Sequence, residues 1–179
     1  MRLLLILLGV VLGALFVRLV TIQPPGTESP SVQKPEPVRQ APDLKFPKLP
    51  GGETSLSALR GKVVLLDFWA TWCGPCRMSI PEVEALYKKY KDRGLQVIGV
   101  SVDDSSTRAM VPQMRRELGM TYPIIFAEDI PDIADKYNSP SIPTLYVIDR
   151  KGQIRSRIEG YTPGDTSLEE QVKELINQS

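Results

Sequence analysis

The longest apolar stretch of the chain lies at its N-terminus. Leu3–Val17 is a run of fifteen uncharged, overwhelmingly apolar positions, and Leu19–Ile22 extends it beyond Arg18. About 20 residues at about 1.5 Å each are enough to cross a hydrocarbon layer of about 30 Å. A cleaved signal peptide is the alternative, but no convincing small-x-small cleavage site follows Phe16. We expect residues 1–22 to be an uncleaved membrane anchor with the N-terminus inside, and Arg18 to reach back to the interface.

The next segment, residues 23–43, has no apolar periodicity. Six of its positions are proline: Pro24, Pro25, Pro30, Pro35, Pro37 and Pro42. This composition favours a partly extended linker of up to about 3 Å per residue, and it counts against a buried core helix just before it. A proline-rich recognition site is the alternative to a plain spacer. We expect a spacer that holds a single folded domain, residues 44–179, away from a membrane.

Short apolar runs separated by turn residues predict a sheet in residues 44–179. Val63–Leu66 and Leu95–Val102 are nearly continuous apolar runs, as is expected of central strands that are covered on both faces. The other expected strands are shorter and are bounded by turn residues. They are Leu44–Pro50 with Glu53–Leu56 as an N-terminal hairpin, Pro123–Phe126, and Thr144–Ile148 with Ile154–Ile158 as a second hairpin.

Helical periodicity appears between these strands. The longest predicted helix runs from about Pro75 to Asp92. Asp103 and Asp104 follow a central strand and are expected to cap a helix that reaches Leu118, rather than to bind a metal. The other expected helical segments are Ser57–Arg60, Asp129–Tyr137 and Asp165–Asn177. The order is therefore β-α-β, then an extra helix and strand, then α-β-β-α.

Charge and composition exclude several classes of function. Residues 44–179 contain 18 basic and 18 acidic side chains, which argues against nucleic acid or an anionic membrane surface as a partner. The chain has no histidine, which excludes histidine catalysis and disfavours a transition-metal site.

The chemistry is concentrated in the only two cysteines, Cys73 and Cys76. A disulfide across two residues would constrain the chain very little, so a purely structural role is unattractive. A structural zinc site needs about four ligands, and covalent haem attachment needs His where the chain has Arg77. Because a strand leads into the pair and a helix follows it, the thiols lie where a helix N-terminus lowers the pKa of a cysteine. The pattern therefore predicts redox chemistry.

The motif Phe68–Cys76, read FWATWCGPC, follows Asp67 directly, and Ser141–Thr144 reads SIPT. Together these features resemble the thioredoxin superfamily over about residues 44–177. The N-terminal anchor and the extra central segment resemble its extracytoplasmic TlpA/ResA-like branch. The resemblance implies an α/β thioredoxin fold, in which helices flank a central mixed sheet. An N-terminal β-hairpin and a central helix-strand insertion are expected additions.

The two cysteines are expected to have different roles. Cys73, at the end of the strand and exposed, is predicted to attack the substrate disulfide, and Cys76, one turn into the helix, to resolve the mixed disulfide. Asp67 lies in a run of Val and Leu, so its pKa should rise toward neutrality. It matches the buried aspartate with which thioredoxins relay the proton of the second cysteine.

The remaining site residues are carried over from the resemblance. Pro143 matches the cis-proline beside the disulfide, and Ile142 is expected to pair with the substrate backbone. Trp72 is expected to cover the disulfide and contact substrate, together with Gly74 and Pro75 between the cysteines. ResA-like proteins usually have Glu where this chain has Ser79. They also often have an uncharged residue at the position of Asp67, so proton handling should be closer to that of thioredoxin.

The sequence therefore predicts a thiol–disulfide oxidoreductase that is anchored by one helix in the inner (cytoplasmic) membrane. Its catalytic domain should face the extracytoplasmic, periplasmic side, reduce disulfide-bonded protein substrates and be re-reduced by a membrane electron donor. Cytochrome c maturation is one candidate pathway. We expect a monomer with no metal and no cofactor beyond the Cys73–Cys76 disulfide. The alternatives are a thiol peroxidase of the same fold and a non-enzymatic, tethered copper or haem delivery module.

Overall fold

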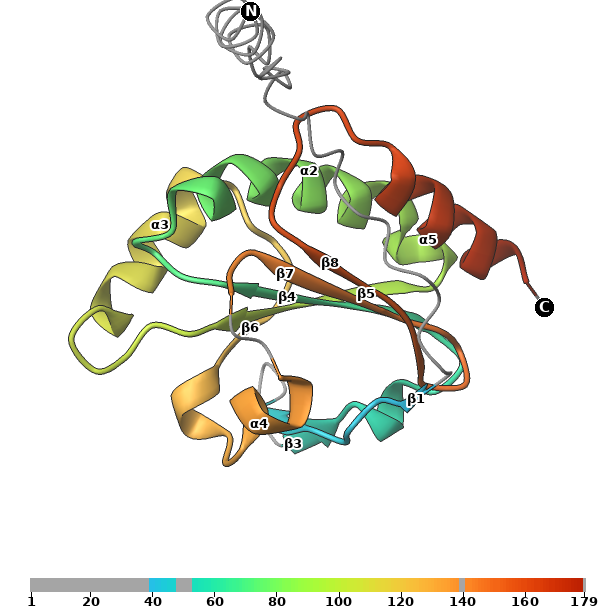
Figure 1. The fold of residues 1–179 in the computed structure, drawn as a ribbon, viewed down its shortest axis with the longest axis horizontal. Helices are drawn as coiled ribbons and strands as arrows, with labels where there is room; N and C mark the ends of the chain where they lie inside the picture. The colour runs from blue at the N-terminus through green and yellow to red at the C-terminus, as the bar shows by residue number, and fades with distance from the viewer. Residues whose placement is uncertain (1–38, 48–52, 139–140, 179) are drawn as a thin grey trace, which may run out of the picture. The chain divides into compact units, whose positions relative to one another are not determined.

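The computed structural model of the chain describes residues 39–47, 53–138 and 141–178. Within them a six-stranded sheet forms the centre of the fold (Figure 1). Its strands, in spatial order, are β1 (Arg39–Gln40), β8 (Gln153–Glu159), β7 (Thr144–Ile148), β4 (Val63–Trp69), β5 (Leu95–Ser101) and β6 (Ile124–Phe126). β4, β5 and β6 run parallel, whereas β4–β7, β7–β8 and β8–β1 pair antiparallel, so the sheet is mixed as predicted.

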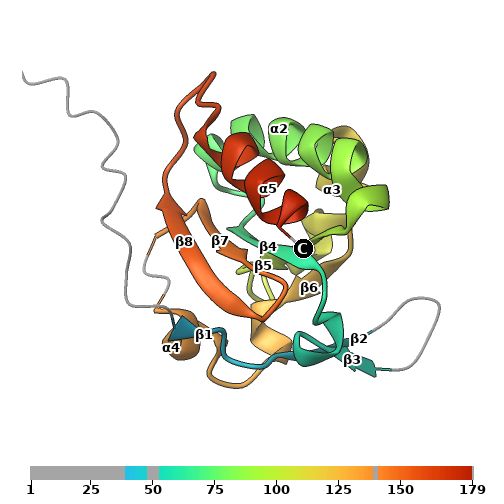
Figure 2. The same ribbon diagram turned by 90° about the vertical axis from the view of Figure 1, so that its right-hand side faces the viewer.

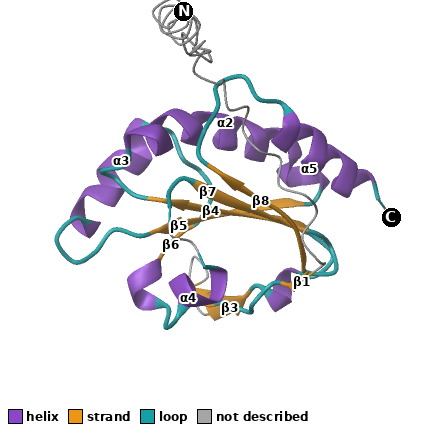
Figure 3. Ribbon diagram, in the orientation of Figure 1, coloured by secondary structure: helices purple, strands orange, loops and turns teal. Residues whose placement is uncertain are grey.

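Helices cover both faces of this sheet. The α-helices of the described residues are α2 (Gly74–Tyr90), α3 (Val111–Glu117), α4 (Ile133–Tyr137) and α5 (Ser167–Asn177). Single 3₁₀ turns add η1 (Ser57–Leu59), η2 (Lys91–Arg93), η3 (Arg108–Met110) and η4 (Ala127–Asp129). Figures 1 and 3 show α2, α3 and α5 on one face, and α4 on the other. The turned view in Figure 2 shows the same layers, with the hairpin of β2 (Lys45–Pro47) and β3 (Glu53–Ser55) on the α4 side.

The two layers follow from the side-chain alternation of β4, all seven residues of which are buried. Its side chains contribute in turn to a helix-side core and a hairpin-side core, because successive residues of a strand point to opposite faces. The helix-side core includes Val63, Leu65, Trp69, Cys73, Cys76, Ile80, Val97 and Val172. The hairpin-side core includes Val64, Leu66, Phe68, Phe46, Leu56, Ile133 and Tyr137. Asp67 follows Leu66 and precedes Phe68, so this carboxyl side chain lies on the helix side.

The thioredoxin fold predicted from sequence is confirmed, including the extra α3–β6 unit between β5 and α4. β2 and β3 pair antiparallel, so the N-terminal hairpin is also confirmed, although its expected turn at Gly51-Gly52 lies outside the described residues.

Two expectations about element boundaries are wrong. The folded unit begins before residue 44, because Arg39 and Gln40 pair with β8, and the N–H of Ala41 donates to the carbonyl of Gly152 at 2.9 Å. Burial of Ala41 in the hairpin-side core explains why these residues belong to the fold rather than to the linker. The helix expected after Asp103 begins only at Val111, with the 3₁₀ turn η3 before it.

The expected membrane anchor, residues 1–22, and most of the expected linker lie outside the described residues. None of the helices in the described ranges is long and apolar enough to cross a membrane.

Candidate active site

The two cysteines lie at the junction of β4 and α2. The chain leaves β4 at Trp69, turns through Ala70–Trp72, and enters α2 with Cys73 as the N-cap residue. Cys73 and Cys76 form a disulfide whose Cα atoms are 5.3 Å apart. The Sγ atom of Cys73 also accepts a hydrogen bond from the backbone N–H of Cys76 at 3.1 Å. A sulfur at this position faces the positive end of the helix dipole, which stabilises a thiolate when the disulfide is reduced.

The two sulfur-bearing residues differ in exposure. Cys76 is completely buried, whereas Cys73 retains 5% of its surface. Cys73 is therefore less exposed than predicted, because the helix-side core packs around both cysteines. As predicted, Cys73 is still the more accessible of the two cysteines, because Cys76 has no exposed surface.

The residues around Cys73 are the most accessible part of the motif. The side chain of Trp72 is 62% exposed, and Gly74 and Pro75 are exposed as well. An exposed Trp beside an accessible sulfur provides an apolar contact for a protein substrate. Trp69, by contrast, is fully buried in the helix-side core.

The loop before β7 brings the predicted proline to the same edge of the sheet. The Ile142–Pro143 peptide bond is cis, as predicted. Thr144, the next residue, pairs with Phe68 at the end of β4, and Ile142 packs against the helix-side core that contains both cysteines. The main-chain N–H and C=O of Ile142 form no hydrogen bond within the described residues. This leaves them available to an extended peptide.

Asp67 lies behind the cysteines in the central strand. Its side chain is completely buried on the helix side, and burial raises its pKa to about 7. The hydroxyl of Tyr122 donates a hydrogen bond to Oδ2 at 3.2 Å and opposes part of this rise. Oδ1 is buried without a partner in the described part of the chain. A carboxyl group with a pKa near neutrality can both accept and release a proton under physiological conditions.

A buried aspartate that the sequence interpretation assigned to a helix cap instead holds the loop before Cys73. Asp103 is 1% exposed and accepts hydrogen bonds from the backbone N–H of Thr71 at 3.0 Å and from the Thr71 hydroxyl at 2.5 Å. The hydroxyl of Ser101 donates to it at 2.8 Å. Asp104 accepts from the N–H groups of Ser106 and Thr107 in the turn before η3, so neither aspartate caps the helix as expected. The polar positions at the end of β5 were the sequence signal, but they do not reveal which aspartate points inward.

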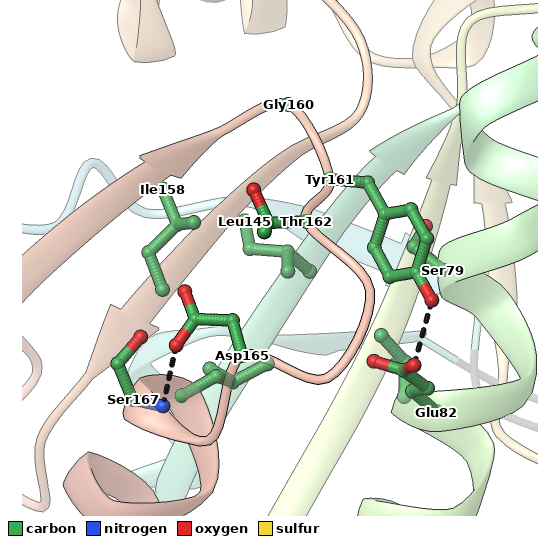
Figure 4. Close-up of a pocket in the computed structure, with 11 residues that line it drawn as sticks. Ser79, Glu82, Leu145, Ile158, Gly160, Tyr161, Thr162, Asp165 and Ser167 are labelled. Carbon is green, nitrogen blue, oxygen red and sulfur yellow. Dashed lines mark hydrogen bonds between the residues drawn. The ribbon is translucent and has the colours of Figure 1, made fainter. Parts of the chain in front are cut away.

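A pocket adjoins this site, between α2 and the loop that joins β8 to α5 (Figure 4). Tyr161 bridges its rim by donating a hydrogen bond to Glu82 of α2 at 2.6 Å. The N–H of Gly160 donates to the carbonyl of Pro143 at 2.9 Å, so the same loop also supports the cis-proline. Its lining includes Ser79, whose hydroxyl donates to the carbonyl of Cys76 at 3.1 Å. Ser79 thus acts on the helix backbone and does not provide a carboxylate at this position.

Two further features near the site are a charged pair and the acidic side chains of the described residues. Arg77 forms an ion pair with Glu117 at 3.8 Å, with both side chains about half exposed, so its charge is a solvated surface charge. In the described ranges no three His, Cys, Asp or Glu side chains are grouped so that they could hold a metal ion.

The chain is similar in sequence and in fold to known proteins. Residues 37–157 match the model of the AhpC/TSA family. The chain belongs to this family. It is 35% identical over 120 residues to the thiol-disulfide oxidoreductase ResA of Geobacillus kaustophilus. The matched residues cover 67% of each of the two chains.

Two further comparisons agree with this assignment. The chain is 40% identical over 118 residues to the thioredoxin-like protein YneN of Bacillus subtilis, covering 65% of this chain and 68% of that one. The crystal structure of a thiol:disulfide interchange protein from Chlorobium tepidum superposes with a TM-score of 0.67 and 27% identity, covering 79% of this chain and 99% of that one. This member of the family is a thiol–disulfide oxidoreductase of thioredoxin fold.

Proposed function

We propose that this oxidoreductase is a reductant of protein disulfides on the extracytoplasmic side of a membrane, acting through the dithiol form of Cys73 and Cys76. The observation that carries the proposal is the unequal access to the two sulfurs beside an extended loop. Cys73 reaches the surface next to the exposed Trp72, while Cys76 is completely buried. A protein disulfide can therefore meet only one of the two thiols first.

The reaction transfers two electrons from the enzyme to the substrate. The Cys73 thiolate attacks one sulfur of the substrate disulfide, and the other substrate sulfur leaves as a thiolate that takes up a proton. Cys76 then loses its proton to Asp67 and attacks the sulfur of Cys73. The mixed disulfide breaks, the second substrate sulfur leaves as a thiolate that takes up a proton from solvent, Asp67 releases the proton of Cys76, and the Cys73–Cys76 disulfide remains. An external reductant must return two electrons and two protons before the next turnover.

The substrate is proposed to bind in an extended conformation along the edge of the site. The main-chain groups of Ile142, which are unpaired within the described residues, support this arrangement, because a peptide strand can pair with them next to Cys73. Trp72, Gly74 and Pro75 are accessible from the same side and would contact the residues that flank the substrate cysteine. Main-chain pairing does not depend on the side chains of the substrate.

Anchoring and location are part of the proposal and rest on the apolar run of residues 3–22. With this segment as a single membrane-spanning helix, the linker would place the catalytic domain on the extracytoplasmic side, with a membrane protein as electron donor. Cell fractionation and protease treatment of spheroplasts test this placement. Loss of the domain to external protease supports it, and full protection contradicts it.

Cytochrome c maturation is the pathway to test first, through the content of c-type cytochromes in a deletion strain.

The decisive experiment measures the reduction of a disulfide-containing protein by the purified full chain in detergent, with dithiothreitol as electron donor. We expect turnover that is abolished in Cys73→Ser and slowed by about 10²-fold in Asp67→Asn, the usual contribution of a general base. The alternatives give different results. A thiol peroxidase would consume hydrogen peroxide rapidly in its reduced form, and a delivery module would bind copper or haem at micromolar concentration. Either result without disulfide reduction would overturn the proposed function.

A further inference from the structure

The only hydrogen bond to the Asp67 side chain within the described residues comes from the α3–β6 insertion. Tyr122 lies in the loop before β6, is completely buried, and donates from its hydroxyl to Oδ2 of Asp67 at 3.2 Å. The two residues are 55 positions apart in sequence. The insertion thus reaches into the centre of the sheet, to the carboxyl group on the cysteine side.

The position of Tyr122 is fixed from several directions. Glu84 of α2 is 4% exposed and accepts hydrogen bonds from the N–H of Thr121 at 2.8 Å and from its hydroxyl at 2.6 Å. The Tyr122 ring packs edge-on against Tyr87 with ring centroids 6.0 Å apart. A Cβ atom at Gly99 would lie 3.2 Å from the same ring, so a glycine at this position allows the close approach. A buried donor that is held this firmly is pre-organised for one acceptor.

We propose that Tyr122 is a positioning residue for the thiol–disulfide reaction, donating a hydrogen bond that keeps Asp67 ionised and ready to accept the proton of Cys76. The inference rests on the proposed role of Asp67 as the base. Tyr122 itself touches neither cysteine nor substrate in this scheme. It acts only through the carboxylate.

Among the polar groups near Asp67 in the described residues, Tyr122 is the one that forms a hydrogen bond with its carboxyl group. Cys73 and Cys76 of the α2 end belong to the core on this face of β4, Tyr87 contacts the Tyr122 ring, and the strand partners of Asp67 are Gly99 and Leu145. Glu84 is occupied by Thr121 and by an ion pair with Lys88 at 3.2 Å. Arg115 points to the carbonyl oxygens of Met120 and Tyr122, and within the described residues no Lys or Arg side chain bonds to Asp67.

The direction of the effect follows from these contacts. Burial favours the neutral carboxylic acid and raises the pKa of Asp67 to about 7, whereas the hydrogen bond from Tyr122 favours the carboxylate and lowers the pKa. Removing the hydroxyl should therefore raise the pKa of Asp67 further. One hydrogen bond to a charged group corresponds to about one pH unit. At neutral pH the ionised fraction would fall from about a half to about a tenth, which is roughly a fivefold loss of base.

The test compares the full chain with Tyr122→Phe in two measurements. The infrared band of the protonated Asp67 carboxyl, assigned by its absence in Asp67→Asn, reports the protonation of this residue directly. The dependence of turnover on pH reports whether the ionised form of Asp67 is needed for the reaction. We expect both the infrared titration and the acid limb of turnover to move upward by about one pH unit in Tyr122→Phe. Turnover at pH 7 should fall about fivefold, return close to the wild-type value at pH 9, and leave KM unchanged.

Three controls separate positioning from a structural role. Tyr87→Phe removes a hydroxyl from the neighbouring ring and should leave the titration of Asp67 unchanged. In the Asp67→Asn background, Tyr122→Phe should cause no further loss, because the effect passes through the carboxylate. Replacement of Tyr122 by 3-fluorotyrosine, a stronger donor, should move the acid limb to lower pH.

The possible failures are distinguishable. An infrared titration of Asp67 that is the same in Tyr122→Phe as in the wild type overturns the inference and leaves the proposed function intact. Equal losses at pH 7 and pH 9, or a loss that persists in the Asp67→Asn background, also overturn it, because they indicate a structural defect. Full turnover by Asp67→Asn overturns the base role in the proposed function instead.

Discussion

The backbone N–H of Cys76 points at the Sγ atom of Cys73 from a distance of 3.1 Å. The same residue that provides the second sulfur of the disulfide thus also provides a hydrogen-bond donor to the first. When the disulfide is reduced, this donor and the positive end of the α2 dipole favour negative charge on Cys73. Cys76, completely buried, has no equivalent access to solvent or to a protein substrate.

The different environments predict different products from the two serine variants. Cys76→Ser should attack disulfide-bonded proteins through Cys73 and remain covalently linked to them, because nothing resolves the mixed disulfide. Cys73→Ser should form no such adducts, because Cys76 cannot be reached. Non-reducing electrophoresis after incubation with a disulfide-containing protein measures both. Equal adduct yields from the two variants would contradict the assignment of roles.

Asp67→Asn should stabilise the folded protein in a pH-dependent way. The pKa of Asp67 is raised from 3.8 to about 7, so the folded state binds its proton more tightly than the unfolded state. The free energy of unfolding of the wild type therefore decreases as the pH rises from about 4 to about 7, and then levels off. The amide of the Asp67→Asn variant does not titrate. The difference between the proteins should approach about 4 kcal/mol above pH 7 and vanish below pH 4.

Urea unfolding of both proteins at several pH values measures this difference. Asp135→Asn is the matched control, because Asp135 is an exposed aspartate on α4 away from the core. It should change the free energy of unfolding by less than about 0.5 kcal/mol at every pH. A constant difference between Asp67→Asn and the wild type from pH 4 to pH 8 would contradict the account of a buried, titrating carboxyl group.

The sequence was sufficient to predict most of the fold because the main elements have strong local patterns. The apolar runs at Val63 and Leu95 became β4 and β5, and the long periodic segment after Pro75 became α2. Arg39–Gln40 could not be predicted as a strand, because it is short and exposed, and pairs with residues more than 100 positions away. An edge strand of two residues has no hydrophobic pattern that would distinguish it from a linker in the sequence.

The site was predictable where a motif fixes the chemistry, and not where tertiary contacts do. Cys73, Cys76 and the cis bond at Pro143 follow from the motifs, and the burial of Asp67 follows from its apolar neighbours. Tyr122 carries no signal in the sequence, because its contact with Asp67 depends on how the α3–β6 insertion folds back across β5.

Asp103→Ala should destabilise the protein substantially. Its carboxylate is the acceptor for two donors of Thr71 and for the hydroxyl of Ser101, all in a buried environment. Removal of the acceptor leaves these donors buried without partners, which should lower the free energy of unfolding by about 2–4 kcal/mol. The adjacent Asp104→Ala variant removes an exposed acceptor from the turn before η3 and should lower the free energy of unfolding by only about 1 kcal/mol. Thermal unfolding of both variants measures the contrast, and equal losses would argue against the buried network.

The reduction potential should identify the enzyme as a reductant. A strongly oxidising disulfide requires a reduced form whose thiolate is heavily stabilised. A thiol with a very low pKa accompanies a reduction potential of about −120 mV in this superfamily, whereas the thiol of thioredoxin, with a pKa of about 7, accompanies about −270 mV. Here Gly74 and Pro75 separate the cysteines and offer no charge and no side-chain donor, and proline also lacks an N–H. Arg77 pairs with Glu117. Stabilisation of the Cys73 thiolate is left to the end of α2, so we expect a potential below about −200 mV.

Equilibration of the full chain with glutathione and dithiothreitol buffers, followed by alkylation of free thiols, measures this potential. Pro75→His provides an internal reference, because a cationic donor between the cysteines should stabilise the thiolate and raise the potential by about 30 mV or more, a tenfold change in equilibrium. Arg77→Gln should leave the potential unchanged if the guanidinium acts only on Glu117. A wild-type value above about −150 mV would make the protein an oxidant of thiols and reverse the proposed direction of electron flow.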